Sequence, residues 1–586
     1  MSRDFYQRVG VYYWVPPDGY TSEQAFGLAA ARIAEIGGRN MHALFNARAN
    51  AYQSLTQLAM RASVKSGFDH PGIGVYLLTT YDATTTPGNP TEKAFLNPNF
   101  YTASNTAALE REYREFTFYL YQTYHGTGKR FIISNWEGDN EIYCGSAYGY
   151  AKDASFRNSC NMAYPSLHLG QQYGSVPNPY AALGAMQLWF AARQRGVAQG
   201  RLDAANAGYS GVEVYHAPEF VSVNILRNSP CRLEDGFCAP GEPTKSLLYD
   251  AIPYLDFDFV SYSAYNSTNL TSPDESPNSA KARLVNDLDT IQSVISSRNI
   301  IIGEFGHGSL GSFGSYPSEV VGRTNDVLDT ALDWGVPYVF NWELFDTGIW
   351  GVYHMDGVTL QPLGDQVFRQ RFQASRWEQV AGTLKQVSVG SAEHIWGVTE
   401  GGQIYRWTAG GWQGVGGWLK QISISAAGAV WGVNSWNNIY RWTGVTWEQM
   451  PGSLEQVSVV NDSNVWGVMS NYIFHWTGLG WEGIPGLLAD LSAAYDGSVW
   501  GVNAGGSVYF WDGSIWELAP GILRQISVGR AGSVWGASPA DDVYKWNPSI
   551  NNWQPIAGKQ LKQVSVGHDG TVWGVDGNGS IWRYRL

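Results

Sequence analysis

Short apolar segments alternate with amphipathic segments over residues 8–342, and turn-forming residues separate them. The apolar segments are rich in β-branched or aromatic side chains, which is typical of buried strands. The amphipathic segments repeat their apolar residues at helical spacing. Strands and helices that alternate in this way predict a parallel sheet covered by helices.

Eight strands are predicted, at Val9–Trp14, Asn40–Phe45, Gly74–Thr79, Arg130–Trp136, Val212–His216, Phe257–Ser263, Asn299–Gly303 and Val336–Trp342. Helices are predicted between them, at Ala25–Ile36, Ala51–Val64, Thr106–Tyr124, Ala181–Arg195, Ala280–Ser296 and Glu319–Trp334. Eight strands interleaved with helices predict a (β/α)8 barrel with enlarged loops, which we assign to residues 1–372. A doubly wound open sheet is the alternative, but no glycine-rich phosphate loop follows the first strand.

The pattern changes near Gln373, where helical periodicity ends and a repeat of roughly 35 residues begins. The pair Trp-Gly recurs at Trp396, Trp431, Trp466, Trp500, Trp535 and Trp573. Each unit reads as four short strands with Gly, Asn or Asp at the turns, which predicts propeller blades. We assign residues 376–586 to an all-β, six-bladed propeller.

The phase of this repeat predicts how the ring closes. The sixth unit contains only three strands, and its third is Ile581–Tyr584. The strand missing from this unit is present at the start of the repeat, as Trp377–Val380. We therefore expect the first strand to complete the last blade, which would leave no open sheet edge.

Composition excludes some classes of partner. The 586 residues carry a net charge of −13 and contain no run of Lys or Arg, which argues against nucleic acid and anionic membranes. No apolar run is long enough for a membrane helix. The 26 Trp suit stacking on sugar rings, although in the repeat a packing role is the alternative.

The four cysteines fall in two local pairs within predicted loops, which predicts the disulfides Cys144–Cys160 and Cys231–Cys238. Disulfides favour an exported protein. The segment Met1–Phe5 lacks the apolar core of a signal peptide, which fits either an intracellular protein or a mature chain without its leader. Because of the predicted disulfides we expect the second, a secreted protein. The sequence contains no Cys/His cluster that would indicate a metal site, and we expect no cofactor.

Two glutamates directly follow predicted barrel strands. Glu137 ends the fourth strand, and Glu304 follows the buried run Ile300–Gly303 of the seventh. Barrel enzymes hold their catalytic residues at this end of the strands. Glycoside hydrolysis needs two carboxyl groups, one to protonate the departing oxygen and one to attack the sugar or activate water.

The run Ile301-Ile302-Gly303-Glu304-Phe305-Gly306, the strand that ends in Glu137, and Phe340-Asn341-Trp342 resemble the retaining glycoside hydrolases of clan A. The resemblance implies Glu137 as acid/base, Glu304 as nucleophile and a poly- or oligosaccharide substrate. The clan has Asn directly before its acid/base, whereas Trp136 precedes Glu137 here. Glu141, which follows Asn140, is therefore the alternative acid/base, and Asp139 is less favoured.

The resemblance also implies supporting residues. Tyr265 resembles the clan's tyrosine that hydrogen-bonds the nucleophile, with Tyr262 as a substitute, and Trp342 resembles its strand-eight tryptophan. His216, at the end of the fifth strand, is a candidate for binding substrate or for a structural role. The remaining candidates for substrate binding are Trp14, Asn135, Trp136, Asn140 and Glu141.

The repeats of the second half resemble tectonin repeats, which occur in lectins of the tachylectin kind. The resemblance implies that the propeller binds a glycan or a cell surface. The whole chain is then expected to be a retaining hydrolase held on its substrate by the propeller. The alternatives are a catalytically inactive barrel–propeller lectin and a transglycosylase.

Overall fold

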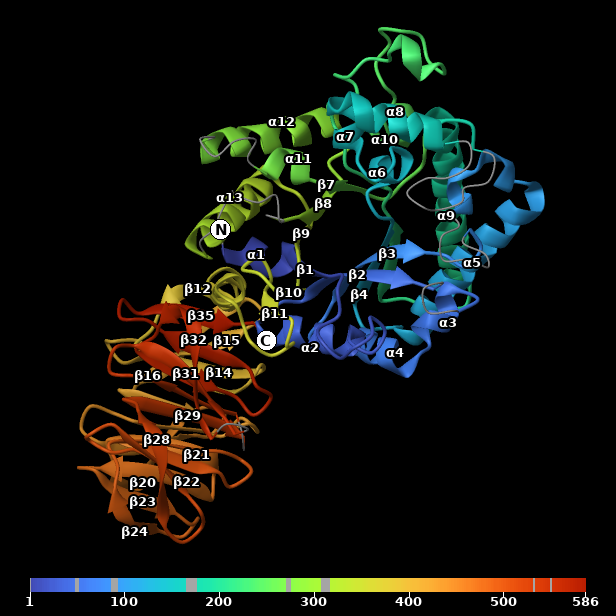
Figure 1. Cartoon of the computed structure of the whole chain (residues 1–586). Coiled ribbons are helices and arrows are strands. Elements are labelled where there is room, and N and C mark those ends of the chain that lie inside the picture. Colours follow the sequence, from blue (N-terminus) through green and yellow to red (C-terminus); the bar gives the residue numbers. More distant parts are fainter. Residues whose placement is uncertain are drawn as a thin grey trace. The chain divides into compact units, whose positions relative to one another are not determined.

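The structure is a computed structural model that describes residues 2–47, 52–85, 93–164, 176–269, 276–306, 317–530, 533–548 and 551–585. Contacts divide the chain into two units, Arg3–Phe372 and Gln373–Leu586. The first unit is a parallel α/β barrel and the second a six-bladed β-propeller (Figure 1), which confirms the predicted fold class. In the described part, no helix is both long and apolar enough to cross a membrane.

The barrel strands are β1 (Val9–Tyr13), β2 (Asn40–Asn46), β3 (Val75–Tyr81), β4 (Lys129–Ser134), β5 (Val212–His216), β6 (Glu219–Phe220), β7 (Val260–Ser263), β8 (Ile300–Phe305) and β9 (Val339–Trp342). They form one sheet in the order β5-β4-β3-β2-β1-β9-β8-β7-β6, with parallel neighbours throughout.

The barrel closes at its fifth strand, which is made of β5 and β6 together. β5 pairs with β4, and β6 pairs with β7. The strand is divided because Pro218 has no backbone N–H to give to the ladder. Ala217 N still donates to Ile133 O (2.8 Å), and Ser261 N donates to Pro218 O (2.9 Å). The two pieces therefore join the two edges of the sheet.

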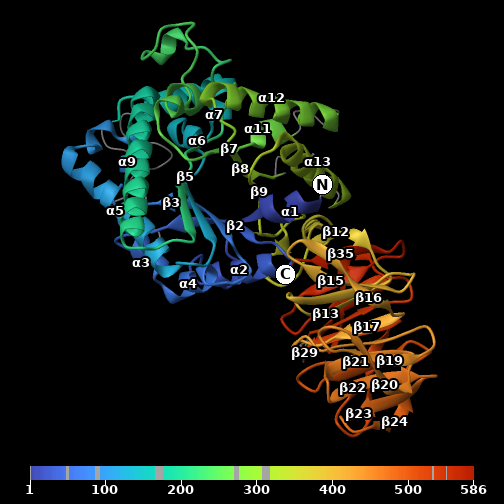
Figure 2. The same ribbon diagram turned by 180° about the vertical axis from the view of Figure 1, so that it is seen from behind.

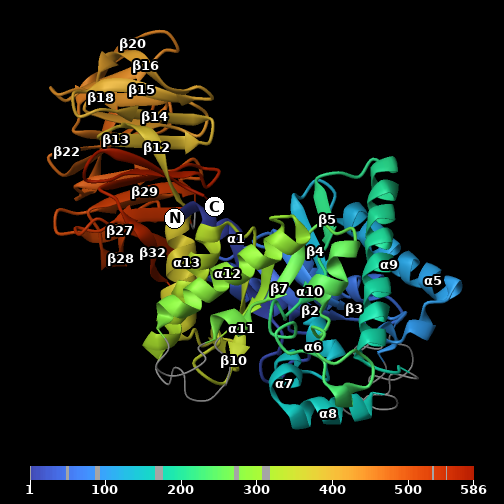
Figure 3. The ribbon, with the colours of Figure 1, turned by 90° about the horizontal axis from the view of Figure 1, so that it is seen from above.

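Helices cover the outside of the barrel. They are α1 (Ser2–Arg8), α2 (Phe26–Glu35), α3 (Leu55–Ala59), α4 (Ala62–Phe68), α5 (Ala103–Thr123), α6 (Gly138–Ile142), α7 (Ala147–Lys152), α8 (Ala154–Ala163), α9 (Pro179–Asn206), α10 (Leu247–Asp250), α11 (Tyr265–Thr268), α12 (Pro277–Ile295), α13 (Pro317–Trp334) and α14 (Gln370–Ser375). The side chains of Thr102 and Asn178 cap α5 and α9. These two long helices lie side by side (Figures 1 and 2), and α12 lies beside α13 (Figure 3).

Alternation along the strands separates two apolar layers. Residues that point outward, such as Val11, Ile133 and Ile302, pack against the helices. Residues that point inward, such as Leu77, Ile132 and Phe340, fill the barrel. This period of two decides which side chains can reach the enclosed end of the barrel.

Both predicted disulfides are formed, Cys144–Cys160 in the segment after β4 and Cys231–Cys238 in the segment after β6. A fully buried ion pair between Arg157 and Asp235 joins the two segments. Asp235, Cys231 and Cys238 are close enough for a shared metal, but the sulfurs are bonded to each other and Asp235 is paired with Arg157. Elsewhere in the described residues no such group of metal ligands occurs.

The propeller consists of six antiparallel sheets of four strands. Five follow one another along the chain: β13–β16 (residues 386–418), β17–β20 (421–453), β21–β24 (456–487), β25–β28 (490–522) and β29–β32 (525–560). The sixth combines β33 (Gln563–Val566), β34 (Val572–Val575) and β35 (Ser580–Tyr584) with β12 (Trp377–Thr383). Trp377 pairs with Tyr584, and Gln379 with Trp582, so the first strand completes the last blade as predicted.

The repeating Gln and Ser of each innermost strand bond to the backbone of the next blade. Gln386 accepts from Ile422 N (2.9 Å) and donates to Ile422 O (3.1 Å), and Ser388 accepts from Ile424 N (3.0 Å). Equivalent bonds recur around the ring, and Ser565 of the last blade accepts from Val389 N of the first (3.0 Å). Side chains therefore hold neighbouring inner strands together where no backbone ladder joins them.

The Trp-Gly signature is explained by packing between and within blades. Trp396 contacts Trp442 of the next blade with ring centroids 5.9 Å apart, and Trp573 of the last blade contacts Trp407 at 5.2 Å. A Cβ on Gly397 would lie 2.4 Å from the side chain of Leu384, so this position excludes larger residues. The repeating tryptophans are packing residues, which was the alternative to sugar stacking.

Asp490 occupies the position that is Gln in the other five blades. It accepts from Ile526 N (2.8 Å) and from Gln456 Nε2 (2.8 Å). Burial nevertheless raises the pKa of Asp490 to about 7. The ionised form of this carboxyl is therefore less stable in the folded propeller than in the unfolded chain.

We expect Asp490→Asn to stabilise the propeller in a pH-dependent way. Because the folded pKa lies above the unfolded value, the native state of the wild type loses stability as pH rises from about 4 to 7. The variant escapes this loss, so its advantage should grow over that window to about 1–2 kcal/mol, or roughly 2–8 °C in Tm. Calorimetry at pH 4, 6 and 8 measures it, with the exposed Glu517→Gln as control. An equal effect at all three pH values would contradict the assignment.

Candidate active site at the carboxyl end of the barrel

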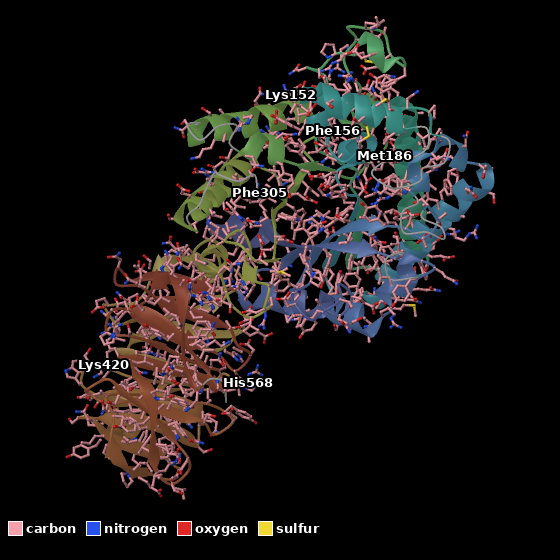
Figure 4. The ribbon with its side chains drawn as sticks, viewed as in Figure 1. Lys152, Phe156, Met186, Phe305, Lys420 and His568 are labelled. Atoms are coloured by element: carbon pink, nitrogen blue, oxygen red, sulfur yellow. A yellow bond between two sulfur atoms is a disulfide. The ribbon has the colours of Figure 1, made fainter. Side chains whose placement is uncertain are left out.

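Glu137 follows β4 and precedes α6 in a strained backbone conformation. Its φ of 26° and ψ of 62° lie in the left-handed region that non-glycine residues rarely adopt. Such strain is often found at functional sites. The next residue is glycine because a Cβ at Gly138 would lie 2.8 Å from Glu219 O and 3.0 Å from Sδ of Met186, which Figure 4 labels on α9.

Asn135 ties the end of β4 to β6. Its Nδ2 donates to Glu219 O (3.0 Å), and its Oδ1 accepts from Glu219 N (2.8 Å). Glu137 N in turn donates to Oε1 of Glu219 (3.0 Å). Asn135 is buried, and through these bonds it positions Glu219 and Glu137.

Glu304 points into the barrel because β8 contains a bulge. Ile300 and Ile302 point outward, so strict alternation would turn Glu304 outward as well. The register with β7 shifts between Tyr262 and Ser263, and Ser263 pairs with Glu304. A bulge of this kind re-aims a side chain, and bulges are common beside active sites.

Tyr265 and Glu304 are in direct contact. Tyr265 Oη donates to Oε2 of Glu304 (3.2 Å), which is the contact that the resemblance to clan A implies. Ala264 N donates to Glu304 O (2.7 Å) and fixes the backbone of the residue. The other carboxylate oxygen, Oε1, is buried and has no hydrogen-bond partner among the described residues. Tyr262 instead donates to Asp287 on the helix side (3.1 Å).

Three buried glutamates have raised pKa values, and the charge of Glu219 contributes to the shifts of the other two. Burial, and then the charge of Glu219, raises the pKa of Glu137 to about 8. Burial raises the pKa of Glu219 to about 7. Burial and the charges of Glu219 and Glu137 raise the pKa of Glu304 well above its ordinary value, which the bond from Tyr265 opposes. Such coupling keeps at least one carboxyl of the cluster protonated near neutral pH.

A chain of hydrogen bonds lies beneath Glu304. His42 Nδ1 bonds to Gly303 O (3.0 Å) and its Nε2 to Thr79 Oγ1 (2.7 Å), while Tyr12 Oη donates to Thr79 Oγ1 (3.3 Å). A carbonyl oxygen only accepts, so Nδ1 carries the proton. Burial lowers the pKa of His42 to about 3, so this imidazole is neutral and supports the backbone before Glu304.

Half-buried aromatic rings lie at or next to the carboxyl ends of β1, β4 and β9. Trp14 lies beside Trp136 with ring centroids 6.4 Å apart, and it meets Tyr12 edge-to-face at 5.6 Å. Trp342 ends β9, where it pairs in register with Tyr12. Rings that are partly exposed next to carboxyl groups offer apolar faces on which a sugar can stack.

The other carboxylates after β4 have structural partners. Glu141 forms an ion pair with Lys93 and accepts from Tyr81 Oη (2.9 Å). Asp139 is fully buried and accepts the N–H groups of Val221, Ser222 and Leu247. Their polar atoms are occupied within the protein, which favours Glu137 over both as the acid/base.

Asn140 also acts within the protein. Its Nδ2 donates to Oε2 of Glu137, and its Oδ1 accepts from Ala147 N (2.7 Å). The bond to Glu137 orients that carboxyl group. The structure therefore places Asn140 beside the cluster as a partner of Glu137.

His216 does not join the cluster. Its ring contacts Gln194 of α9 through Nδ1 (3.1 Å) and lies near Phe190 of the same helix. His216 has the same parity along the strand as the outward-pointing Val214, so its side chain faces the helices. The structure therefore places His216 against α9, which favours the structural role that was one of its two predicted roles.

Three residues of the site were not predicted from the sequence. Glu219 lies beyond the Ala217-Pro218 break at which the predicted strand ended, and His42 lies at an inward position of β2. Glu343 directly follows Trp342, and burial and Asp346 raise its pKa to about 8. The available signal was a carboxylate just after a barrel strand, which Glu219 and Glu343 share with Glu137 and Glu304.

The propeller exposes a different set of aromatic residues from those that repeat. Trp418 is 72% and Trp436 81% exposed. Lys420, labelled in Figure 4, bonds to Asn437 and so joins the segment after Trp418 to the turn that carries Trp436. Trp418, at the end of β16, and Trp436, in the turn between β18 and β19, therefore lie at the same end of two neighbouring blades.

The chain combines an α/β barrel that contains an acidic cluster with a six-bladed β-propeller. Residues 345–411, 403–474 and 469–586 match the family model described as the Tectonin domain. The propeller is therefore built from Tectonin repeats. No curated protein sequence matches the chain.

Two solved structures illustrate what the chain is similar to. One, "YCF48 bound to D1 peptide", has 14% identity and a TM-score of 0.28, with 36% of this chain and 95% of that chain covered. The other, "Crystal structure of WD40 beta propeller domain of Doa1", has 13% identity and a TM-score of 0.28, with 36% of this chain and 97% of that chain covered.

We expect Glu304→Gln to raise the stability of the barrel at neutral and alkaline pH. Since the folded pKa of Glu304 is raised, the wild type loses stability as pH rises above about 4.5, and a neutral amide avoids this loss. Thermal unfolding should show a higher Tm for the variant at pH 8 and little change at pH 4.

Glu141→Gln is the matched comparison, because it should lower the Tm by leaving Lys93 without its buried partner. A Glu304→Gln variant less stable than the wild type at pH 8 would contradict the electrostatic description of the cluster.

Proposed function

We propose that the chain is a retaining glycoside hydrolase whose propeller binds the glycan on which the barrel acts. The observation that supports this most directly is that Glu137 and Glu304 stand at the carboxyl ends of two barrel strands, close enough for their charges to interact. Tyr265 bonds to Glu304, and Asn140 bonds to Glu137. The two disulfides support secretion.

In the first step Glu304 is ionised, because the proton on Glu137 removes one of the negative charges that raise the pKa of Glu304. Its Oε1 attacks the anomeric carbon, and the bond to the leaving oxygen breaks. That oxygen keeps the electron pair and takes the proton of Glu137. In the second step Glu137 removes a proton from water, which attacks the same carbon and releases Glu304. The raised pKa of Glu137, about 8, supports the acid role because the group then holds its proton near neutral pH.

Other residues orient these two groups. Tyr265 donates to Oε2 of Glu304 and leaves Oε1 for the sugar. His42 holds the carbonyl of Gly303, and Asn140 directs the Glu137 carboxyl. Trp14, Trp136 and Trp342 supply partly exposed rings against which the sugar packs.

Substitution of the two glutamates tests the proposal. Glu304→Gln should lower kcat by a factor of roughly 10³ or more, and Glu137→Gln by about 10²–10⁴, least for a substrate with an activated leaving group. Release of reducing sugar from a panel of polysaccharides measures this, and proton NMR of the first product should show the substrate's anomeric configuration.

Glu141→Gln is the control and should keep at least roughly a tenth of the activity, since Glu141 is held by Lys93 and Tyr81. Equal loss in Glu141→Gln and Glu137→Gln would reopen the choice of acid. A wild type that binds glycans without turnover would favour the lectin, and transfer to an added acceptor sugar in place of water would favour the transglycosylase.

Exposed aromatic rings support glycan binding by the propeller. We expect Trp418→Ala with Trp436→Ala to weaken binding of the full chain to an insoluble polysaccharide by about tenfold or more, because each ring offers a face for stacking. Sedimentation with the polysaccharide, in a Glu304→Gln background that prevents turnover, measures the affinity. Leu479→Ala, at a residue 96% exposed on another turn, is the control. An equal loss in both variants would argue against a specific surface.

A further inference from the structure

Glu219 is a completely buried glutamate that the two-step reaction does not use. Its Oε1 accepts from Glu137 N (3.0 Å) and from Ser263 Oγ (3.2 Å), and its Oε2 accepts from Ser261 Oγ (2.6 Å). These three donors favour the ionised form and oppose the burial that raises the pKa of Glu219 to about 7. Glu219 is therefore the member of the cluster whose surroundings best stabilise a negative charge.

Glu219 touches both chain segments that carry the reacting carboxyl groups. On one side it accepts the backbone N–H of Glu137. On the other, a Cβ added to Gly303 would lie 2.4 Å from Oε2 of Glu219, so the carboxylate occupies the space beside the residue that precedes Glu304. One side chain thus fixes the separation of two strand ends.

We propose that Glu219 is a positioning residue: it holds the segments of Glu137 and Glu304 in place, and its negative charge keeps Glu137 in the acid form. This inference rests on the proposed hydrolysis, because it assigns Glu137 as the acid. It also explains why Asn135 bonds both backbone groups of Glu219, since any movement of Glu219 would move Glu137.

The charged groups around Glu137 are acidic. Glu219 on β6 raises its pKa most after burial, followed by Glu141 and Asp139 from α6, while Asn140 lowers it. Around Glu304 the acidic groups are Glu219, Glu137 and Glu343, with the Tyr265 hydroxyl as donor. The tyrosines Tyr12 and Tyr265 remain neutral because burial raises their pKa values.

Lys93 forms an ion pair with Glu141 of this set. After burial, the charge of Glu219 raises the pKa of Glu137 more than any other group does. Removal of this charge should therefore lower the pKa of Glu137. A carboxylate–carboxylate interaction in a buried site is worth on the order of one pKa unit or more.

Two substitutions separate position from charge. Glu219→Gln keeps the length of the side chain and an oxygen for Glu137 N, but removes the charge. Glu219→Asp keeps the charge and shortens the side chain, so the contact with Glu137 N is lost. A residue with a merely structural role would respond to both changes in the same way.

The pH dependence of kcat/KM is the first measurement. In Glu219→Gln the alkaline limb should move to lower pH by about one unit or more, because Glu137 loses its proton more easily. In Glu219→Asp the limb should stay in place while kcat falls by roughly tenfold or more, since the acid is displaced. An unmoved limb in Glu219→Gln, or identical profiles for the two variants, would overturn the proposal.

Thermal unfolding tests the same inference without turnover, which separates its failure from that of the proposed hydrolysis. The Tm difference between Glu137→Gln and the wild type should rise with pH above about 4.5 and level off near the folded pKa of Glu137, about 8. In a Glu219→Gln background the same difference should level off at lower pH and reach a smaller value. An unchanged curve would refute the inference even if the chain hydrolyses glycans, and a shifted curve would support it even if no substrate is found.

Discussion

The amide of Asn135 holds the barrel together at the point where its chemistry is concentrated. It bonds both backbone groups of Glu219, and Glu219 bonds the backbone of Glu137. Pro218 interrupts the ladder just before this point, so side-chain hydrogen bonds from Asn135 join the end of β4 to β6, while β6 keeps its backbone pairing with β7. Closure of the barrel and placement of the candidate acid therefore depend on one short network.

The propeller uses the same physical device on a larger scale. Gln and Ser side chains of each inner strand bond to the backbone of the next blade, as Gln386 and Ser388 do to Ile422 and Ile424. These polar side chains are half-buried or buried, and hydrogen bonds to the next blade satisfy them there. Among the residues that recur about every 35 positions are thus those whose side chains bond to the backbone of the next blade.

Much of this architecture was predictable from the sequence because apolar periodicity reflects burial directly. The predictions failed where one residue changed the geometry. The predicted helix Ala181–Arg195 stopped before Gly196 and Gly200, yet α9 continues to Asn206, because these glycines allow close approach to α5: a Cβ on Gly196 would lie 2.5 Å from Glu110 O. The bulge before Glu304 turns this side chain into the barrel. Pro218 ended the predicted strand before Glu219. Neither effect can be recognised in a pattern of hydrophobic residues.

The pairing of β12 with β35 has a consequence for how the molecule is made. The two strands belong to one sheet but are separated by almost the whole propeller, with Trp377 opposite Tyr584. During synthesis β12 leaves the ribosome long before β35 does, so the ring cannot close while the intervening blades are being made. Until then β12 has a free edge, and closure of the ring joins the first strand of the propeller to be made with the last.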